Sequence, residues 1–205
     1  MALGTYSELK ASVANWLDRD DLTTEIVDFI ALAEARFNRE LRTPDMEARA
    51  TASTSGEYLA LPDGFLGMRS IYLSGSPQTP LDYFAPHLLR MTHSSGETGQ
   101  PTSYTIADDQ LIFAPIPSTA QTVEILYYGK IPALSDSNTT NWLLTAHPDL
   151  YLSGALAAAA AFIDDPRMAL WKATSDEAIV FINESGEKRR RGSAPLVARA
   201  MTAFG

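Results

Sequence analysis

The sequence predicts an α+β fold that is mainly α: a helical bundle with an inserted small antiparallel β subdomain and an extended C-terminal tail. Apolar residues recur at spacings of three and four near both ends of the chain, which is typical of amphipathic helices. The middle of the chain consists of short segments rich in β-branched and aromatic residues, separated by turn residues. The last residues show neither a helix cap nor a clear period. We therefore expect the bundle in residues 1–45 and 141–187, the insert in residues 46–140 and the tail in residues 188–205.

Two N-terminal helices are expected, over residues 7–17 and 23–41. The second is the better marked, with Thr23 as its expected N-cap. Its predicted buried stripe consists of Ile26, Phe29, Ile30, Ala33, Phe37 and Leu41. Arg36 and Glu40 lie four residues apart on the exposed side, where they can form a weak ion pair. Pro44 ends the helix, because the residue before a proline resists the helical conformation.

The predicted β subdomain is a series of short strands joined by tight turns. Gly56 and the pair Asp108 and Asp109 are expected at hairpin tips, since glycine and aspartate tolerate the backbone conformations of such turns. Residues 83–91 are expected to form one or two helical turns, and residues 131–140 to cross back to the helices. The expected strands are residues 48–54, 57–61, 68–73, 79–81, 103–107, 110–113 and 121–128.

A C-terminal pair of helices completes the predicted bundle. Residues 150–163 are apolar on every side, which is typical of a helix buried in a core, and their alanines predict close approach by a neighbouring helix. The run is too short for a bilayer, which requires about 20 residues. A second helix is expected to begin with Asp165 as N-cap and Pro166 at its first position, and to end at Gly186. Because the link is so short, the two helices must lie antiparallel. The apolar face of the second helix is expected to contain Met168, Trp171, Ser175, Ala178, Ile179 and Ile182.

The composition excludes several classes of protein. The chain has 205 residues, a net charge of −9 and no cysteine. It therefore has no disulfide scaffold, no thiolate metal site and no cysteine nucleophile. Residues 187–205 contain five basic residues and one glutamate, so the rest of the chain is more acidic than the whole. An acidic body argues against wrapping nucleic acid, whereas a basic end suits an acidic partner.

The candidate chemical groups do not form a recognisable catalytic motif. His87, His93 and His147 have no second ligand at a spacing typical of metal sites. The paired aspartates occur in predicted turns, where aspartate is favoured for its local hydrogen bonds. We therefore expect a protein that is not an enzyme and that needs no metal or cofactor.

The sharpest charge feature is the basic run Lys188, Arg189, Arg190 and Arg191. In one interpretation, these cations simply complement the dipole at the end of a helix. In a second, they dock onto an acidic protein surface, and apolar residues of the tail follow them into a groove. Direct binding of nucleic acid is a third interpretation, for which one run of four residues on an acidic chain is weak evidence. The apolar tail residues are Leu196, Val197, Met201 and Phe204.

An ordered series of short motifs over residues 6–192 resembles the head-to-tail adaptor proteins, also called connector or head-completion proteins, of tailed bacteriophages, particularly short-tailed ones. The residues that carry the resemblance are Trp16-Leu17, 28–42 (DFIALAEARFNRELR), 61–65 (LPDGF), 99–104 (GQPTSY), 114–117 (APIP), Tyr127-Tyr128, 131–134 (IPAL), 141–144 (NWLL), 148–152 (PDLYL) and 154–156 (GAL).

The resemblance implies a structural protein of the virion, present in the host cytoplasm during assembly. Such proteins form a ring of about twelve copies beneath the portal protein, in which each interface joins two different faces. The ring extends the DNA channel, through which DNA passes without specific binding, and it offers a docking surface to a tail nozzle or tail-tube protein. Their C-terminal segment commonly reaches into the portal, which suits residues 188–205. No membrane partner is implied.

The exposed face of residues 23–42 is the expected ring contact, with Arg36, Arg39, Glu40 and Arg42 as candidate contact residues. Two alternatives remain open. One is a virion-associated cell-wall hydrolase, which would need a pair of acids in a cleft. The other is a DNA-binding accessory protein led by the basic run.

Overall fold

The chain divides into two compact units in a computed structural model that describes residues 3–191. The helical unit comprises Met1–Asp45 and Ile131–Gly205, and the β unit comprises Met46–Lys130. The fold is mixed, with 44% helix and 25% strand, so helix predominates as expected. The crossover at residues 131–140 belongs to the helical unit and not to the insert as predicted, because its backbone is hydrogen-bonded to the second helix.

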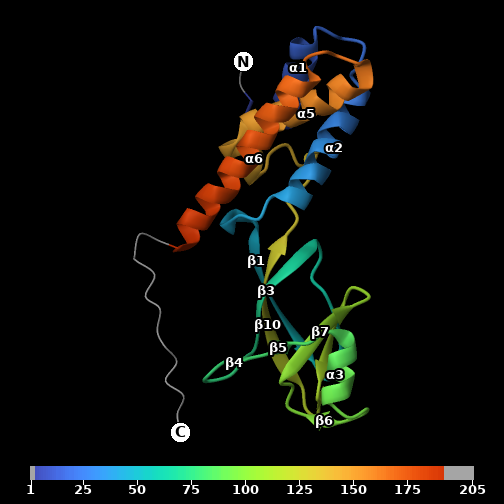
Figure 1. The fold of residues 1–205 in the computed structure, drawn as a ribbon, viewed down its shortest axis with the longest axis vertical. Helices are drawn as coiled ribbons and strands as arrows, with labels where there is room; N and C mark the ends of the chain where they lie inside the picture. The colour runs from blue at the N-terminus through green and yellow to red at the C-terminus, as the bar shows by residue number, and fades with distance from the viewer. Residues whose placement is uncertain (1–2, 192–205) are drawn as a thin grey trace. The chain divides into compact units, whose positions relative to one another are not determined.

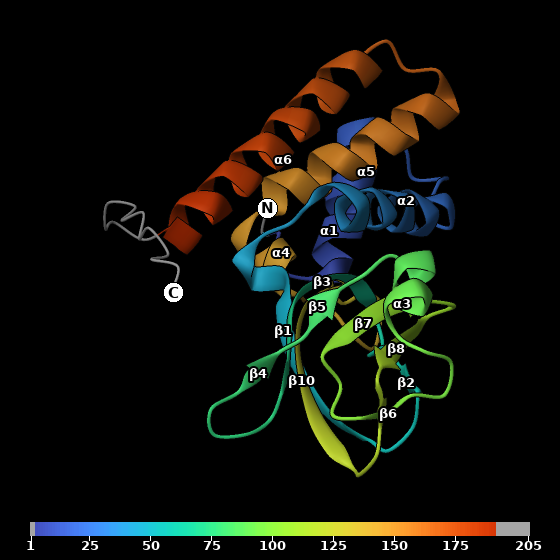
Figure 2. The ribbon, with the colours of Figure 1, turned by 60° about the horizontal axis from the view of Figure 1, so that its bottom comes forward.

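The helical unit is built around one central helix (Figures 1 and 2). α5 (Pro148–Ile163) contacts α6 (Met168–Arg191) as well as α1 (Tyr6–Leu17), α2 (Glu25–Glu40) and the short α4 (Trp142–Ala146). The residues of α5 that face these helices are almost completely buried, as a helix apolar on every side requires. A short 3₁₀ turn, η1 (Pro44–Met46), follows α2 and leads into the β unit.

Polar side chains cap the starts of two helices, α1 and α4. The Thr5 hydroxyl accepts the Glu8 N–H at the start of α1, and Asn141 accepts the Leu144 N–H at 2.8 Å at the start of α4. The prediction that Thr23 caps α2 is wrong. The Leu22 carbonyl already accepts the Ile26 N–H, so the helical turn includes Thr23, and the helix begins without a side-chain cap.

Gly154 allows α5 to approach α2 closely. A Cβ atom at this position would lie 2.7 Å from the Cζ atom of Phe37 and 3.3 Å from the Cβ atom of Ala33. The Phe37 ring packs edge-on against Tyr151 of α5, with 5.3 Å between ring centroids. The close approach predicted for the alanine-rich helix therefore occurs against α2 as well as against α6.

α6 is longer than its sequence predicts. Regular helix begins at Met168, after a tight turn in which the Asp165 carboxylate accepts the Arg167 N–H at 2.8 Å. The helix does not end at Gly186 but continues to Arg191. Gly186 is instead a point of close packing, because a Cβ atom there would lie 3.0 Å from the Cδ atom of Pro44. The predicted extended tail therefore begins within helix, since residues 188–191 form its last turn.

A buried polar network holds the crossover on the helices. One oxygen of Glu34 on α2 accepts the Leu134 N–H at 2.8 Å and the Tyr151 hydroxyl at 3.0 Å. Asn141 donates to the Tyr151 hydroxyl and to the Pro132 carbonyl, both at 2.7 Å. Burial raises the pKa of Glu34, against the opposing effect of the two hydrogen bonds that it accepts.

The β unit contains two four-stranded sheets and a small two-stranded one (Figure 1). The strand orders are β1-β10-β3-β4, β2-β8-β7-β5 and β6-β9. The first two sheets enclose a core made of Ile71, Leu73, Leu81, Tyr104, Leu111, Phe113, Val123, Ile125 and Tyr127. The strands are β1 (Glu47–Thr54), β2 (Tyr58–Ala60), β3 (Phe65–Leu73), β4 (Thr79–Pro80), β5 (Asp82–Tyr83), β6 (Thr98–Gly99), β7 (Ser103–Ala107), β8 (Gln110–Ala114), β9 (Ile116–Pro117) and β10 (Gln121–Gly129), and α3 (Pro86–Thr92) lies between β5 and β6.

The prediction of an antiparallel subdomain is right for most strand pairs but not for all. β5 pairs with β7, and β6 with β9, in parallel. Asp108 and Asp109 form the β7–β8 hairpin turn as expected, with φ of 51° and 54°. Gly56 is not at a hairpin tip, because β1 and β2 belong to different sheets.

Candidate partner interface

The last turn of α6 carries the basic run, and two of its arginines bind elsewhere in the helical unit. Arg189 forms a bidentate ion pair with Asp45, in which Nη1 lies 3.3 Å from Oδ1. Arg190 pairs with Glu187 and donates to the Arg42 carbonyl at 3.0 Å. The Lys188 and Arg191 side chains are exposed. The run therefore combines outward-facing charge with contacts that organise the helical unit itself.

Those contacts hold the linker, by which we mean residues 41–45 between α2 and the β unit. Asn183 of α6 accepts the Arg42 N–H at 2.9 Å and donates to the Glu40 carbonyl at 3.0 Å. Gly186, one helical turn further on, packs directly against Thr43 and Pro44. The linker is therefore attached along the second half of α6.

The predicted ring-contact residues differ in whether they form ion pairs within the chain. Arg36 pairs with Glu40 at 2.9 Å and also binds Asp176 on α6 of the same chain. Hydrogen bonds from Lys172 and Arg36 lower the pKa of Asp176, so this carboxylate stays charged. Arg39 is exposed and forms no ion pair within residues 3–191.

A pocket of about 330 Å³ lies beside the end of α6. Its polar lining includes the ion pair of Asp45 and Arg189, and its apolar lining includes Trp142 and Ile182. The full lining is Asp45, Trp142, Ala146, His147, Ile182, Ser185 and Arg189. The pocket thus combines charged groups with an apolar wall, which is typical of sites that bind side chains of a partner.

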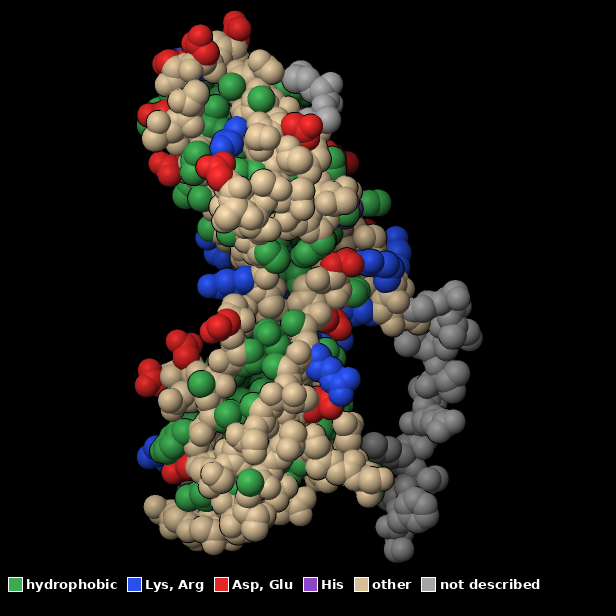
Figure 3. All heavy atoms as spheres, turned by 180° about the vertical axis from the view of Figure 1, so that it is seen from behind, with side chains coloured by type: hydrophobic (Ala, Val, Ile, Leu, Met, Phe, Trp, Pro, Cys, Tyr) green, Lys and Arg blue, Asp and Glu red, His purple; other side chains and the backbone are tan. Residues whose placement is uncertain are grey.

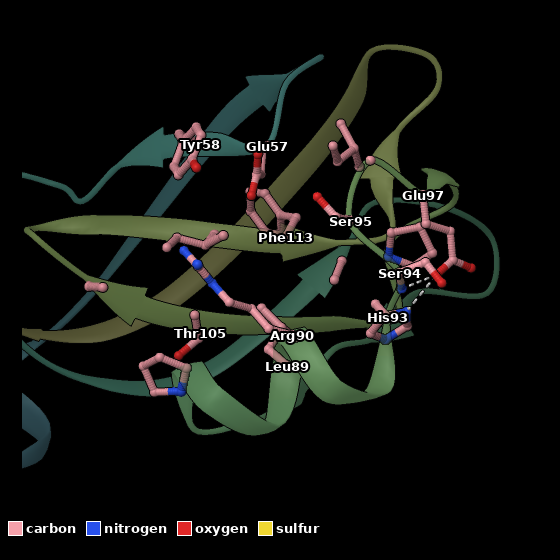
Figure 4. Close-up of a pocket in the computed structure, with 17 residues that line it drawn as sticks. Glu57, Tyr58, Leu89, Arg90, His93, Ser94, Ser95, Glu97, Thr105 and Phe113 are labelled. Atoms are coloured by element: carbon pink, nitrogen blue, oxygen red, sulfur yellow. Dashed lines mark hydrogen bonds and ion pairs between the residues drawn. The ribbon is translucent and has the colours of Figure 1, made fainter.

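A larger pocket of about 520 Å³ lies in the β unit, between α3 and the face of the β2-β8-β7 strands (Figure 4). Arg90 extends from α3 toward Tyr58 and Glu57, and His93 lies 3.3 Å from Glu97 in the neighbouring loop. No serine hydroxyl is hydrogen-bonded to this imidazole among the residues that the structure describes. Among these residues the His93 imidazole is therefore paired with a carboxylate and not with a serine.

Opposite charges gather at the two ends of the helical unit (Figure 3). Residues 18–28, which are the α1–α2 link and the first turn of α2, and residues 164–167, which join α5 to α6, contain seven acidic residues against two arginines. Both arginines pair locally, Arg19 with Asp21 at 2.6 Å and Arg167 with Asp165 at 2.7 Å. The far end carries the basic run. This separation gives the helical unit a strong charge polarity, which can orient partners as they approach.

The part of the chain that the structure describes contains neither a cluster of metal ligands nor a membrane-spanning helix. No group of three or more histidine, aspartate or glutamate side chains there could hold a metal ion. No helix there is long and apolar enough to span a membrane.

A family model described as SU10 adaptor protein matches residues 4–199, which is nearly the whole chain. The chain belongs to this family. The SU10 adaptor proteins are a phage head-to-tail adaptor family, which is a structural class and not an enzyme class. Membership therefore confirms the resemblance to the head-to-tail adaptor proteins and supports a structural role in the virion. A search of curated proteins finds no match.

The sequence located only part of this adaptor's candidate interface. Asp45, Asn183 and Trp142 were not among the predicted site residues, because each acquires its place only through contacts between distant parts of the chain. In the sequence, Asp45 is marked only by its place directly after Pro44, a pair of residues that is typical of a turn. The apolar tail residues of the predicted portal contact lie outside the described residues: Leu196, Val197, Met201 and Phe204.

Proposed function

We propose that this adaptor forms a ring of about twelve copies that binds the portal protein through its C-terminal end. The observation that carries the proposal is the last turn of α6, which presents exposed Lys188 and Arg191 on a chain that is otherwise acidic. Residues 192–205 follow in the sequence and contain one arginine and several apolar residues. Charge would steer the segment to an acidic portal surface, and the apolar groups would anchor it there.

In the proposed ring, the exposed face of α2 meets a different face of the next copy. Arg39 is the strongest of the predicted contact residues, because its charge is not neutralised within the described chain. Arg36 and Glu40 also form ion pairs within the chain, so their part would be to fix α2 against α6. A heterologous contact of this kind closes into a ring when the rotation between copies fits. The helical bundle would act as the rigid scaffold of that ring.

The same ring would extend the DNA channel and offer its free side to a tail nozzle or tail-tube protein. The net charge of −9 supports passage without specific binding, since acidic side chains that face a lumen repel the phosphate backbone. We place the protein in the virion after assembly and in the host cytoplasm before it.

The decisive experiment compares three chains for binding to the portal of the same phage. These are the full chain, a chain that ends at Arg191, and a chain that ends at Glu187. We expect the full chain to bind, the first truncation to bind more weakly, and the second to lose binding, because it removes both the charges and the apolar residues. Binding that is undiminished in the chain that ends at Glu187 would exclude the C-terminal end from the portal contact.

Two control assays address the alternative functions. A cell-wall hydrolase would lyse purified cell wall, and we expect no lysis. A DNA-binding protein would retain DNA with an affinity that falls steeply as salt is raised, and we expect no such retention.

A further inference from the structure

We propose that the pocket beside the end of α6 binds a carboxylate side chain of an acidic, apolar partner segment, and that this binding frees the linker by displacing Asp45 from Arg189. The inference depends on the proposed function only for the identity of the natural partner, since the portal is the protein proposed to meet this end of α6. The site itself follows from the residues that line the pocket.

The lining fits an acidic side chain that has an apolar neighbour. Arg189 supplies a guanidinium that already holds one carboxylate in a bidentate pair. The imidazole of His147 also lines the pocket. Trp142 and Ile182 supply an apolar wall. The volume of about 330 Å³ is large enough for a side chain and part of its backbone. Lys188, exposed on the same turn as Arg189, would favour the approach of a negatively charged segment.

The ion pair between Arg189 and Asp45 is weak enough for another carboxylate to replace Asp45. The Arg189 side chain is 55% exposed and that of Asp45 is 39% exposed, so water and salt screen their attraction. The apolar neighbour of a partner carboxylate would add contacts with Trp142 and Ile182. Arg189 would therefore exchange one carboxylate for another at little cost in its own hydrogen bonding.

Displacement of Asp45 would act on the linker, because Asp45 is its last residue before the β unit begins at Met46. The linker, as it lies against α6, already contains an unfavourable buried polar group. The Thr43 side chain is fully buried, and its hydroxyl has no hydrogen-bond partner among the residues that the structure describes. Release of the linker would return this hydroxyl to water. Partner binding at the end of α6 would thereby change the freedom of the chain that leads into the β unit.

The test uses the full-length protein and a synthetic peptide of alternating aspartate and leucine, with a lysine and leucine peptide as control. Calorimetry measures binding, and hydrogen exchange with mass spectrometry measures the opening of residues 41–46. We expect the acidic peptide to bind and to speed exchange in this segment about threefold, since local opening sets the exchange rate and an exposed ion pair contributes only weakly to holding it closed. The basic peptide should do neither.

Three variants separate the steps. Ala146→Leu adds bulk to the pocket wall and keeps both residues of the ion pair, and it should abolish peptide binding while exchange stays slow. Asp45→Asn weakens the ion pair and should give fast exchange without peptide. Arg19→Gln removes an exposed cation at the acidic end of the helical unit and should match the wild type in both measurements. Melting curves verify that each variant is folded.

The proposal is overturned if the acidic peptide does not bind, if it binds without a change in exchange, or if Ala146→Leu binds it normally. The exchange measurement is then repeated with portal in place of peptide. Portal that binds and leaves exchange unchanged overturns the release alone. Portal that does not bind overturns the proposed function and leaves the peptide result standing.

Discussion

The Tyr151 hydroxyl donates a hydrogen bond of 3.0 Å to the carboxylate of Glu34, a side chain that is only 8% exposed. The same oxygen accepts the Leu134 N–H, so one buried acid joins α2, α5 and the crossover. Burial raises the pKa of Glu34 above its ordinary value of 4.5, and it also raises the pKa of Tyr151. A charged group in this place is costly, whereas a neutral one keeps both hydrogen bonds at less cost.

Glu34 should therefore make the stability of the helical unit depend on pH. The folded protein keeps a proton on Glu34 at pH values at which the unfolded chain has already lost it. Its stabilising effect is fully present below pH 4.5 and is lost as the pH rises through the higher folded pKa. In Glu34→Gln, the side-chain oxygen can still accept both hydrogen bonds and the charge is absent.

We accordingly expect Glu34→Gln to melt at a higher temperature than the wild type at pH 8, with a smaller difference at pH 5. Thermal melts at the two values measure this. Asp28→Asn, on the exposed side of the same helix, is the matched control and should show no gain in stability at pH 8, because an exposed carboxylate carries no burial cost. A variant at position 34 that is destabilised equally at both pH values would contradict the argument.

Gly154→Ala should destabilise the helical unit by about 1–3 kcal/mol, the usual cost of overpacking a core. The added methyl group would lie 2.7 Å from the Phe37 ring, which Tyr151 also contacts, so the ring has little room to move. Chemical denaturation measures the loss. Gly56→Ala is the control, because a Cβ atom there has nothing within 4 Å, and it should be close to neutral. Equal stability of the Gly154 variant and the wild type would show that α2 and α5 can separate easily.

These examples show how far the sequence can predict this fold. The buried stripe around Phe29 and Phe37 follows from local periodicity, and the structure buries both side chains as expected. Gly186 was misinterpreted, because the local preference of glycine for helix ends says nothing about a backbone that packs against it from position 43. The role of Arg189 could not be predicted either. Its partner Asp45 lies 144 positions earlier, and only the folded chain brings the two together.

Arg36 and Arg39 should differ sharply when each is replaced by alanine. Arg36→Ala removes ion pairs to Glu40 and Asp176 and should cost about 1 kcal/mol of stability, since the pairs are only partly buried. Arg39→Ala removes no ion pair and should leave stability unchanged, but it should weaken self-association if α2 forms the ring contact. Denaturation and sedimentation measure the two properties. Unchanged association of the Arg39 variant would remove this residue from the proposed ring interface.

Asn183→Ala should loosen the linker while leaving most of α6 intact. The Asn183 side chain makes two hydrogen bonds, one from the Arg42 N–H and one to the Glu40 carbonyl, and both backbone groups would need new partners after its removal. We expect a loss of about 1–2 kcal/mol in stability and faster hydrogen exchange at Arg42. Glu184→Ala, next to it on the exposed side of α6, is the control and should change neither. If Arg42 exchanges at the wild-type rate in the Asn183 variant, then Arg190 and the packing of Gly186 suffice to hold the linker on α6.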